Sequence, residues 1–282
     1  MKITAQARAK INWSLGICGN RPDGYHDLDM LMQRIELCDE LTFENARWLT
    51  LSINGQKLPT GDRNLVIRAA NALNDALGTK NGARITLKKR IPSRAGLGGG
   101  SADSAATLLA LNRLWNLNLP LRTLAQIGKK LGADVPYCLC SSLARVQGIG
   151  EIVTPLEKSP VYPMVIVTPG GGLSTPAVFQ EWNRGGHPMT KVHNDALADA
   201  LMRGELDRAQ ALSHNDLEAP AIALMPEIGG LIEKFRSLGG KYVRMTGSGS
   251  TVFAVFESDE AAISAAQQVP GAIFTRTAGD NA

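Results

Sequence analysis

The stretch of the sequence that decides the fold is IPSRAGLGGGSADSAA, residues 91–106, in which four glycines lead directly into a helix-forming segment. Glycine lacks a Cβ, so successive residues can turn their N–H groups toward one centre. A helix that follows presents its unpaired first-turn N–H groups and the positive end of its dipole to the same point. The stretch therefore predicts a phosphate-binding loop and then a helix over residues 102–115, capped by Ser101 or Asp103.

Two common phosphate-binding motifs do not fit this loop. The Walker motif G-x-x-x-x-G-K-[ST] needs a lysine after its last glycine, and no lysine follows these glycines at that spacing. The dinucleotide motif G-x-G-x-x-G begins at Gly96 and Gly98 but has Ser101 where its third glycine belongs. A third kind of phosphate loop is therefore indicated, and a flexible surface turn is the alternative.

The composition is that of an ordinary globular protein. Its 282 residues are 44% hydrophobic, which is enough for one large or two medium domains. The net charge of +4 comes from scattered Lys and Arg residues, a distribution that disfavours a nucleic-acid surface and suits anionic small molecules. The sequence shows no targeting segment and no apolar run of transmembrane length, so we expect a cytoplasmic protein with no nucleic-acid or membrane partner. The cysteines, which are expected to be reduced, are Cys18, Cys38, Cys138 and Cys140.

Polar and apolar alternation, together with the positions of glycine and proline, predicts an α+β protein. In the first part we expect strands at residues 3–17, 26–37, 40–44, 48–53 and 84–89, helices at 64–77 and 121–131, and a hairpin at 143–155. In the second part we expect strands at residues 161–168, 241–245, 251–256 and 272–276, and helices at 175–182, 191–202, 206–213, 227–238 and 259–268. A second glycine cluster after residue 168 favours a boundary between two domains, residues 1–160 and 161–282.

Three separated segments carry a resemblance to a known family. They are AKIN at residues 9–12 continuing to RPDGYH at 21–26, the glycine loop, and TGSGS at 246–250. The chain resembles the GHMP small-molecule kinases over essentially its whole length, because residues 64–70, 131–136 and 215–218 also match in order. The resemblance implies the two-domain GHMP kinase fold, with mixed sheets and helices, an ATP-binding N-terminal domain, and an active site in the cleft that the C-terminal domain completes.

Within that family, DGYH at residues 23–26 and GADVP at 132–136 indicate one branch. Its members use ATP to phosphorylate the 2-hydroxyl of 4-diphosphocytidyl-2-C-methyl-D-erythritol, a step of the non-mevalonate isoprenoid pathway. The alternatives are a GHMP kinase for homoserine, a mevalonate derivative or a sugar, and an inactive kinase-fold binding protein. The sequence departs from the family pattern at Ala9, which replaces a proline, and at Ser93 and Arg94, where Arg94 is placed to perturb the rim of the nucleotide site.

The resemblance implies that Asp134 is the catalytic base and Lys10 its cationic companion. Phosphoryl transfer to an alcohol needs an acceptor for the hydroxyl proton and positive charge around the transferred group. The plainer readings are a turn or helix cap for Asp134 and a solvated lysine for Lys10. Strand alternation places Asn12 on the same face as Lys10, and the resemblance makes it a substrate-binding residue.

The cytidine group is assigned by the same resemblance to Tyr25, His26 and Phe179, two aromatic faces and an imidazole. An aromatic side chain stacked on a base contributes about 1–3 kcal/mol in nucleic-acid binders. Thr175 is a further substrate contact on this reading. The alternatives are core aromatics, a structural histidine and a helix N-cap.

ATP is assigned to the glycine loop. The implied residues are Pro92, Ser93, Arg94, Ala95, Gly96, Leu97, Gly98, Gly99, Gly100, Ser101 and Ala102, with Asn64 and Lys89 near the adenine. Mg²⁺ is expected with ATP, and Ser101 is placed either to bind it or to cap the helix. Gly247 and Gly249 suit either a loop that approaches the substrate or a simple hairpin turn. We expect a monomer or weak homodimer whose partners are the cytidyl substrate and ATP.

Overall fold

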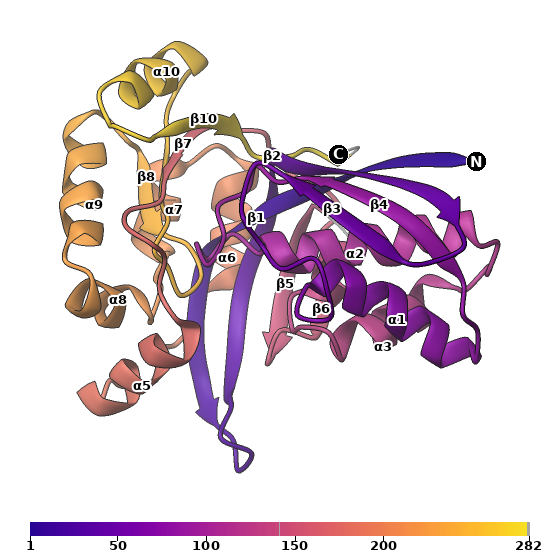
Figure 1. The fold of residues 1–282 in the computed structure, drawn as a ribbon. Helices are drawn as coiled ribbons and strands as arrows, with labels where there is room; N and C mark the ends of the chain where they lie inside the picture. The colour runs from indigo at the N-terminus through magenta and orange to yellow at the C-terminus, as the bar shows by residue number, and fades with distance from the viewer. Residues whose placement is uncertain (141, 281–282) are drawn as a thin grey trace. The chain divides into compact units, whose positions relative to one another are not determined.

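The computed structural model describes residues 1–140 and 142–280, and the chain divides into two compact units (Figure 1). Unit 1 comprises Met1–Ala9, Leu37–Pro92 and Gly98–Ser141, and unit 2 comprises Lys10–Glu36, Ser93–Leu97 and Ser142–Ala282. Each unit is built from several segments of the sequence, because the long strands β1 (Lys2–Asn20) and β2 (His26–Ala46) contribute residues to both. The division of the sequence near residue 160 stays a proposal.

Unit 1 is a sheet with helices on one of its faces, as Figure 1 shows. The second half of β2 pairs antiparallel with β4 (Gly82–Lys88), and β4 pairs parallel with β3 (Thr50–Asn54). The helices are α1 (Leu65–Leu77), α2 (Gly99–Leu114), α3 (Leu121–Lys129) and α4 (Val135–Cys140). Alternate residues of the strands, such as Phe43 and Ile85, and apolar residues of the helices, such as Leu73 and Leu108, form one buried core.

Unit 2 contains two sets of antiparallel strands. The first half of β2 pairs with β5 (Leu143–Gly148), which pairs with β6 (Ile152–Pro155). A second sheet has the order β10-β7-β9-β8, with β7 (Pro163–Val167), β8 (Tyr242–Met245), β9 (Val252–Val255) and β10 (Ile273–Arg276). The rings of Trp13, Tyr242 and Phe253 pack together in its core, the first two edge to face at 4.9 Å.

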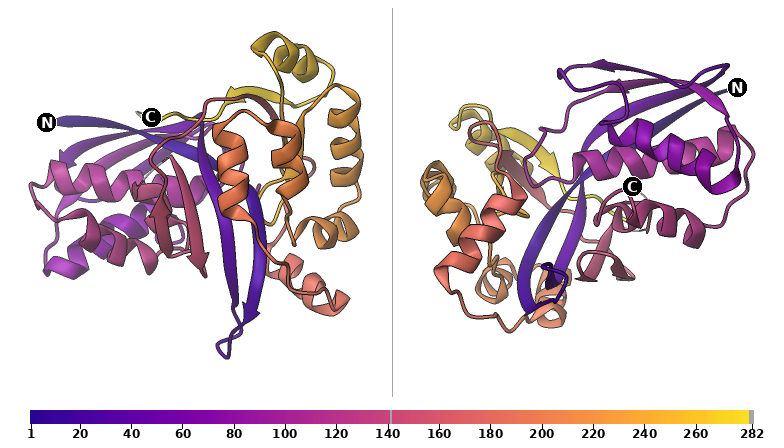
Figure 2. Two further views of the ribbon diagram at one scale, coloured as in Figure 1. Left: turned by 180° about the vertical axis from the view of Figure 1, so that it is seen from behind. Right: turned by 60° about the horizontal axis from the view of Figure 1, so that its bottom comes forward.

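Six helices belong to the described part of unit 2, drawn in salmon to yellow in Figure 2. They are α5 (Thr175–Gly185), α6 (Asn194–Met202), α7 (Leu206–Leu212), α8 (Glu218–Leu224), α9 (Glu227–Ser237) and α10 (Asp259–Gln267). None of the helices in the described part of the chain has the length and apolar character needed to cross a bilayer.

The expected α+β organisation is confirmed, two expectations about its elements are wrong, and two helices were not predicted. Residues 26–37 and 40–44 belong to one strand, because the side chain of Asp39 is satisfied inside the protein and does not interrupt β2. The helix after the glycine loop begins at Gly99, so Ser101 and Asp103 lie within it and do not cap it. Helices α4 and α8 were not predicted; each is short and has a proline in its first turn, Pro136 and Pro220, which is typical of a loop or a helix boundary.

Candidate active site

The first half of the glycine loop belongs to unit 2, where it is held between β1 and the turn of residues 246–250. Lys10 N donates to Leu97 O at 3.0 Å, and Thr251 N donates to Ala95 O at 3.2 Å. Gly96 has a φ of +76°, and a Cβ there would collide with Thr246 O. Only glycine meets both conditions, so this position fixes how closely the two loops approach.

The second half of the loop starts helix α2 in unit 1. Gly98, with a φ of +66°, is the N-cap, and no side chain takes the usual capping role. Helix geometry leaves the first N–H groups of α2 without acceptors in the helix, which makes this end suited to an anion. Arg94 is exposed and adopts a left-handed φ of +56°, a conformation that glycine would adopt more easily. Its expected influence on the rim of a nucleotide site stays a prediction.

A buried ion cluster lies directly behind this helix start. Lys89 Nζ pairs with Asp39 Oδ2 and, at 2.8 Å, with Asp103 Oδ2. Asp39 Oδ1 also accepts from the backbone N–H groups of Arg90 and Ile91. A Cβ at Gly99 would lie 3.0 Å from Lys89 Nζ, so the ammonium packs closely against the backbone at the start of α2. In the structure the Lys89 ammonium pairs with two buried carboxylates beside the glycine loop. Its expected position near the adenine stays a prediction.

Asp103 is the member of the cluster whose carboxylate is incompletely hydrogen-bonded. Among the described residues its Oδ1 has no hydrogen-bond partner, and burial raises its pKa to about 7, with Lys89 opposing the shift and Asp39 adding to it. One ammonium faces two carboxylates, so the buried cluster carries an excess negative charge when both are ionised. Such a charge is costly in a region of low dielectric constant.

Stability should therefore fall as the pH rises. The folded protein holds a proton on Asp103 between its ordinary pKa of 3.8 and about 7, whereas the unfolded chain has lost it. Between pH 5 and pH 7.5 we expect Asp103→Asn to gain at least about 1.4 kcal/mol in unfolding free energy relative to wild type, the equivalent of one pKa unit. Urea unfolding at several pH values measures this. Asp259→Asn, at a surface carboxyl of lowered pKa, is the control and should track the wild-type slope.

Asp134 lies in unit 1, in the turn between α3 and α4. Its carbonyl oxygen accepts from Cys138 N at 3.1 Å, so the residue stands at the start of α4, and its side chain is half-buried. The turn lies beside the first turn of α2: a Cβ at Gly132 would be 3.5 Å from Ser101 Oγ. Unit 1 thus brings the predicted base close to the predicted phosphate loop.

Lys10 lies in unit 2 and is buried on β1. Its Nζ donates to Asn12 Oδ1 at 2.7 Å, which confirms that alternation places both side chains on one face. Thr246 Oγ1 accepts from Asn12 N at 2.9 Å, and a Cβ at Gly247 would be 3.3 Å from Lys10 Nζ. These contacts form a polar group beside the glycine loop. Because Lys10 and Asp134 belong to different units, their joint action stays a prediction.

The residues predicted to bind cytidine come from the β1–β2 connection, the first residue of β2, and α5. His26 stacks on Phe179 at 5.0 Å between ring centroids and meets Trp182 edge to face at 5.3 Å. Its Nε2 lies 3.0 Å from Asn183 Oδ1. Tyr25 is 61% exposed, so it is not the core aromatic that the plainer reading required.

Trp182 and Asn183 were missed by the sequence analysis. They follow Phe179 by three and four residues on α5, the spacing that places side chains on one face of a helix. In the sequence, this spacing from Phe179 indicates that Trp182 and Asn183 lie on the same helix face as Phe179. Thr175, at the start of the same helix, shares a hydrogen bond of 2.7 Å with Ser248 Oγ. The turn of residues 246–250 therefore joins β8 to β9 and also contacts β1 and α5.

Two further predicted residues have clear structural contacts. Asn64 is the N-cap of α1, accepting from Val66 N at 2.9 Å, and its role near adenine stays a prediction. Ser101 offers a hydroxyl at the start of α2. In the described ranges, residues 1–140 and 142–280, no cluster of three or more His, Cys, Asp or Glu side chains is arranged for a metal ion. Since Asp103 is paired with Lys89, Ser101 is the better oxygen donor at this helix start.

Comparison with known proteins places these features in one family. Residues 64–142 match the family described as "GHMP kinases N terminal domain", and residues 197–273 match "GHMP kinases C terminal". The chain is 42% identical over 264 residues to the 4-diphosphocytidyl-2-C-methyl-D-erythritol kinase of Pelotomaculum thermopropionicum, covering 93% of this chain and 92% of the relative.

Solved structures give the same result. A crystal structure of 4-(cytidine 5'-diphospho)-2C-methyl-D-erythritol kinase superposes with a TM-score of 0.85 at 36% identity, covering 98% of this chain and 100% of that one. Homoserine kinase from Cytophaga hutchinsonii superposes with a TM-score of 0.73 at 18% identity, covering 99% and 95%. The second likeness shows a shared fold, while the first extends to the sequence.

Proposed function

The chain belongs to the GHMP kinase family, and from this premise we propose how its residues carry out ATP-dependent phosphorylation of the 2-hydroxyl of 4-diphosphocytidyl-2-C-methyl-D-erythritol. Relatives of that name, about 40% identical over nearly the whole chain, support this activity over the other small alcohols. The single observation that carries the residue assignment is the buried Lys10 ammonium, hydrogen-bonded to Asn12 beside the glycine loop.

In the proposed reaction Asp134 accepts the proton of the substrate hydroxyl as its oxygen attacks the γ-phosphorus of ATP. The bond from that phosphorus to the bridging oxygen breaks, and ADP leaves with the electron pair. Lys10 stabilises the negative charge on the transferred group, and Asn12 holds the Lys10 ammonium in place. Direct in-line transfer needs no covalent intermediate on the protein.

The glycine loop is proposed to hold the ATP phosphates through N–H groups of residues 96–102. Mg²⁺ takes most of its oxygen ligands from phosphates and water, so few protein donors are needed beside bound ATP. Ser101 fits that requirement, and the ion would neutralise charge on the phosphates. Lys89 and Asp103 hold the loop from behind through their buried ion pair.

The cytidine group is proposed to bind at the aromatic group of Tyr25, His26, Phe179 and Trp182. The exposed ring of Tyr25 is available to stack on a base, and the stacked pair His26–Phe179 provides a second flat surface. Thr175, linked to Ser248, is proposed as a further substrate contact. No other site is needed to distinguish this substrate from alcohols without a base.

Phe179→Ala should raise the KM for the cytidyl substrate about 5- to 150-fold, because one aromatic face in contact with a base contributes about 1–3 kcal/mol. The KM for ATP should stay near the wild-type value. A coupled ADP-release assay measures both constants. Wild-type protein in the same assay should turn over the cytidyl substrate and leave homoserine, mevalonate and galactose unchanged.

Val178→Ala is the matched control, because Val178 is the neighbouring residue on α5 and is fully buried. It removes packing from the same helix without altering the aromatic group. An unchanged KM for the cytidyl substrate in Phe179→Ala would rule out this cytidine site. Efficient turnover of another alcohol in place of the cytidyl substrate would overturn the proposed function itself.

A further inference from the structure

The segment Asn215-Asp216-Leu217-Glu218 has no part in the reaction described so far. It spans the end of the connection from α7 to α8 and the first residue of α8, and it contacts both β1 and the turn of residues 246–250. We propose that Asn215 is a positioning residue that fixes this turn against β1 and thereby sets the place of the Lys10 ammonium. The inference rests on the proposed function, because it concerns how that site is held.

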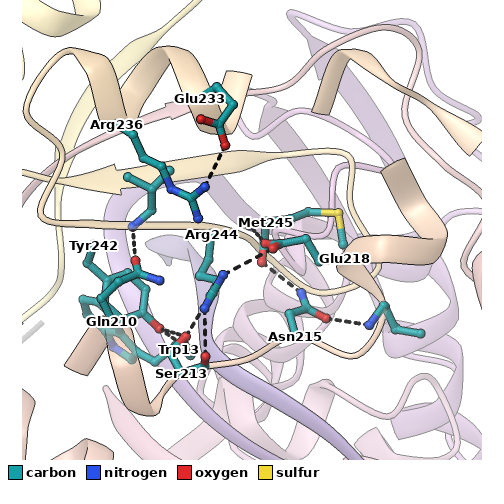
Figure 3. Close-up of polar contacts among 12 residues, drawn as sticks. Trp13, Gln210, Ser213, Asn215, Glu218, Glu233, Arg236, Tyr242, Arg244 and Met245 are labelled. Atoms are coloured by element: carbon teal, nitrogen blue, oxygen red, sulfur yellow. Dashed lines mark hydrogen bonds and ion pairs between the residues drawn. The ribbon is translucent and has the colours of Figure 1, made fainter. Parts of the chain in front are cut away.

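Asn215 uses both ends of its side-chain amide (Figure 3). Its Nδ2 donates to Met245 O and to Gly247 O, each at 2.9 Å. Its Oδ1 accepts from Leu217 N at 3.0 Å, which orients the amide. The two carbonyl groups belong to the residues before and after Thr246, so one amide holds the backbone on both sides of this residue.

The segment that carries Asn215 is itself fixed to β1. Leu15 N donates to His214 O, and Asp216 N donates to Leu15 O, both at 2.9 Å. These bonds form an isolated parallel bridge between Leu15 and Asn215. Asp216 Oδ2 accepts from Ile17 N at 2.7 Å. Asn215 therefore stands at a fixed place relative to the strand that carries Lys10 and Asn12.

The turn is linked to Lys10 through the side chains of Thr246 and Asn12. Thr246 Oγ1 accepts from Asn12 N at 2.9 Å and donates to Asn12 Oδ1 at 3.4 Å. The same Asn12 Oδ1 accepts from Lys10 Nζ at 2.7 Å. Hydrogen bonds and the backbone of residues 245–247 thus connect Asn215 through Thr246 and Asn12 to the ammonium.

A second contact fixes the base of the turn. Met245 N donates to Glu218 Oε2 at 2.8 Å, and Arg244 pairs with the other oxygen of Glu218 at 3.3 Å (Figure 3). These bonds hold Arg244 and Met245 at the end of β8, and Met245 is the residue before Thr246. Asn215 contacts the residues on both sides of Thr246, whereas Glu218 contacts the turn no further than Met245, and for that reason we assign the positioning role to Asn215 and not to Glu218.

Asn215→Asp is the sharpest test because it keeps the size of the side chain. The carboxylate still accepts from Leu217 N, but it replaces the donor by an oxygen that faces the Met245 and Gly247 carbonyls. Ser213→Ala is the matched control. Ser213 Oγ donates to Trp13 O and accepts from Tyr242 and Arg244, so its loss disturbs buried hydrogen bonds of the same region.

Three quantities are measured for each variant: the urea unfolding midpoint, kcat with the KM of both substrates, and hydrogen exchange of a peptide spanning residues 245–251. We expect both variants to be destabilised. Only Asn215→Asp should lower kcat, by about 10- to 100-fold, since a small misplacement of a reacting group has this effect. Only Asn215→Asp should accelerate exchange in the turn.

A double-mutant cycle with Thr246→Val adds a readout that general destabilisation would not move. If Asn215 acts through Thr246, Asn215→Asp should lower kcat less in the Thr246→Val background than in wild type. Wild-type exchange or wild-type kcat in folded Asn215→Asp, an equal kcat loss in Ser213→Ala, or additivity in the cycle would each overturn the positioning role. Failure of the Lys10 assignment is a separate result, seen as normal turnover in a Lys10 variant.

Discussion

Asp134→Asn is expected to lower kcat by about 10²- to 10⁴-fold, the range that a positioned general base contributes. The amide cannot take the proton of the substrate hydroxyl at neutral pH. The glycine loop is untouched by the change, so the KM for ATP should stay within a few-fold of wild type. The loss should appear in both kcat and kcat/KM, as expected for an interaction made in the transition state.

The substitution also separates the two readings of Asp134. The residue stands at the start of α4, where asparagine caps a helix as well as aspartate does. If Asp134 only caps α4, Asp134→Asn keeps its activity and Asp134→Ala loses about 1 kcal/mol of stability. If it is the base, both variants lose activity and the asparagine variant keeps its unfolding midpoint. Turnover near wild type in Asp134→Asn contradicts the base assignment.

The part of the fold that follows from local sequence was predictable. Alternation in β1 placed Lys10 and Asn12 on one face, and the two side chains share a hydrogen bond of 2.7 Å. Apolar periodicity predicted the helix α2 and its end to within one residue, but the predicted start was three residues too late. The reason is that the expected start was set by a side-chain cap, whereas the helix begins after Gly98, which has no side chain to mark the cap position.

Long-range contacts explain what the sequence did not reveal. Asp39 reads as a break in a strand, and its partners, the Lys89 ammonium and the backbone N–H groups of residues 90 and 91, are about fifty residues away in the sequence. The role of Asn215 is hidden for the same reason, because its partners Met245 and Gly247 are thirty residues further along the chain. Trp182 and Asn183 have a local signal, because they follow Phe179 by three and four residues on one helix.

Lys10→Met is expected to lower kcat/KM for ATP by about 10²- to 10³-fold, the cost of removing one group that stabilises transition-state charge. Methionine has nearly the length of lysine and suits the buried strand, so the unfolding midpoint should change little. Lys10→Arg should not restore activity. The ammonium has little space, because a Cβ on Gly247 would lie 3.3 Å from Lys10 Nζ, and the wider guanidinium would displace the turn.

Lys80→Met, at an exposed position, is the matched control for the loss of one positive charge and should keep wild-type kinetics. The double variant Lys10→Met/Asp134→Asn tests whether the two residues act on one step. Groups that act as a unit are strongly non-additive, so the double variant should be about as slow as the slower single variant. Losses that multiply would mean that the residues act independently. Near-normal turnover in Lys10→Met would remove Lys10 from the reaction altogether.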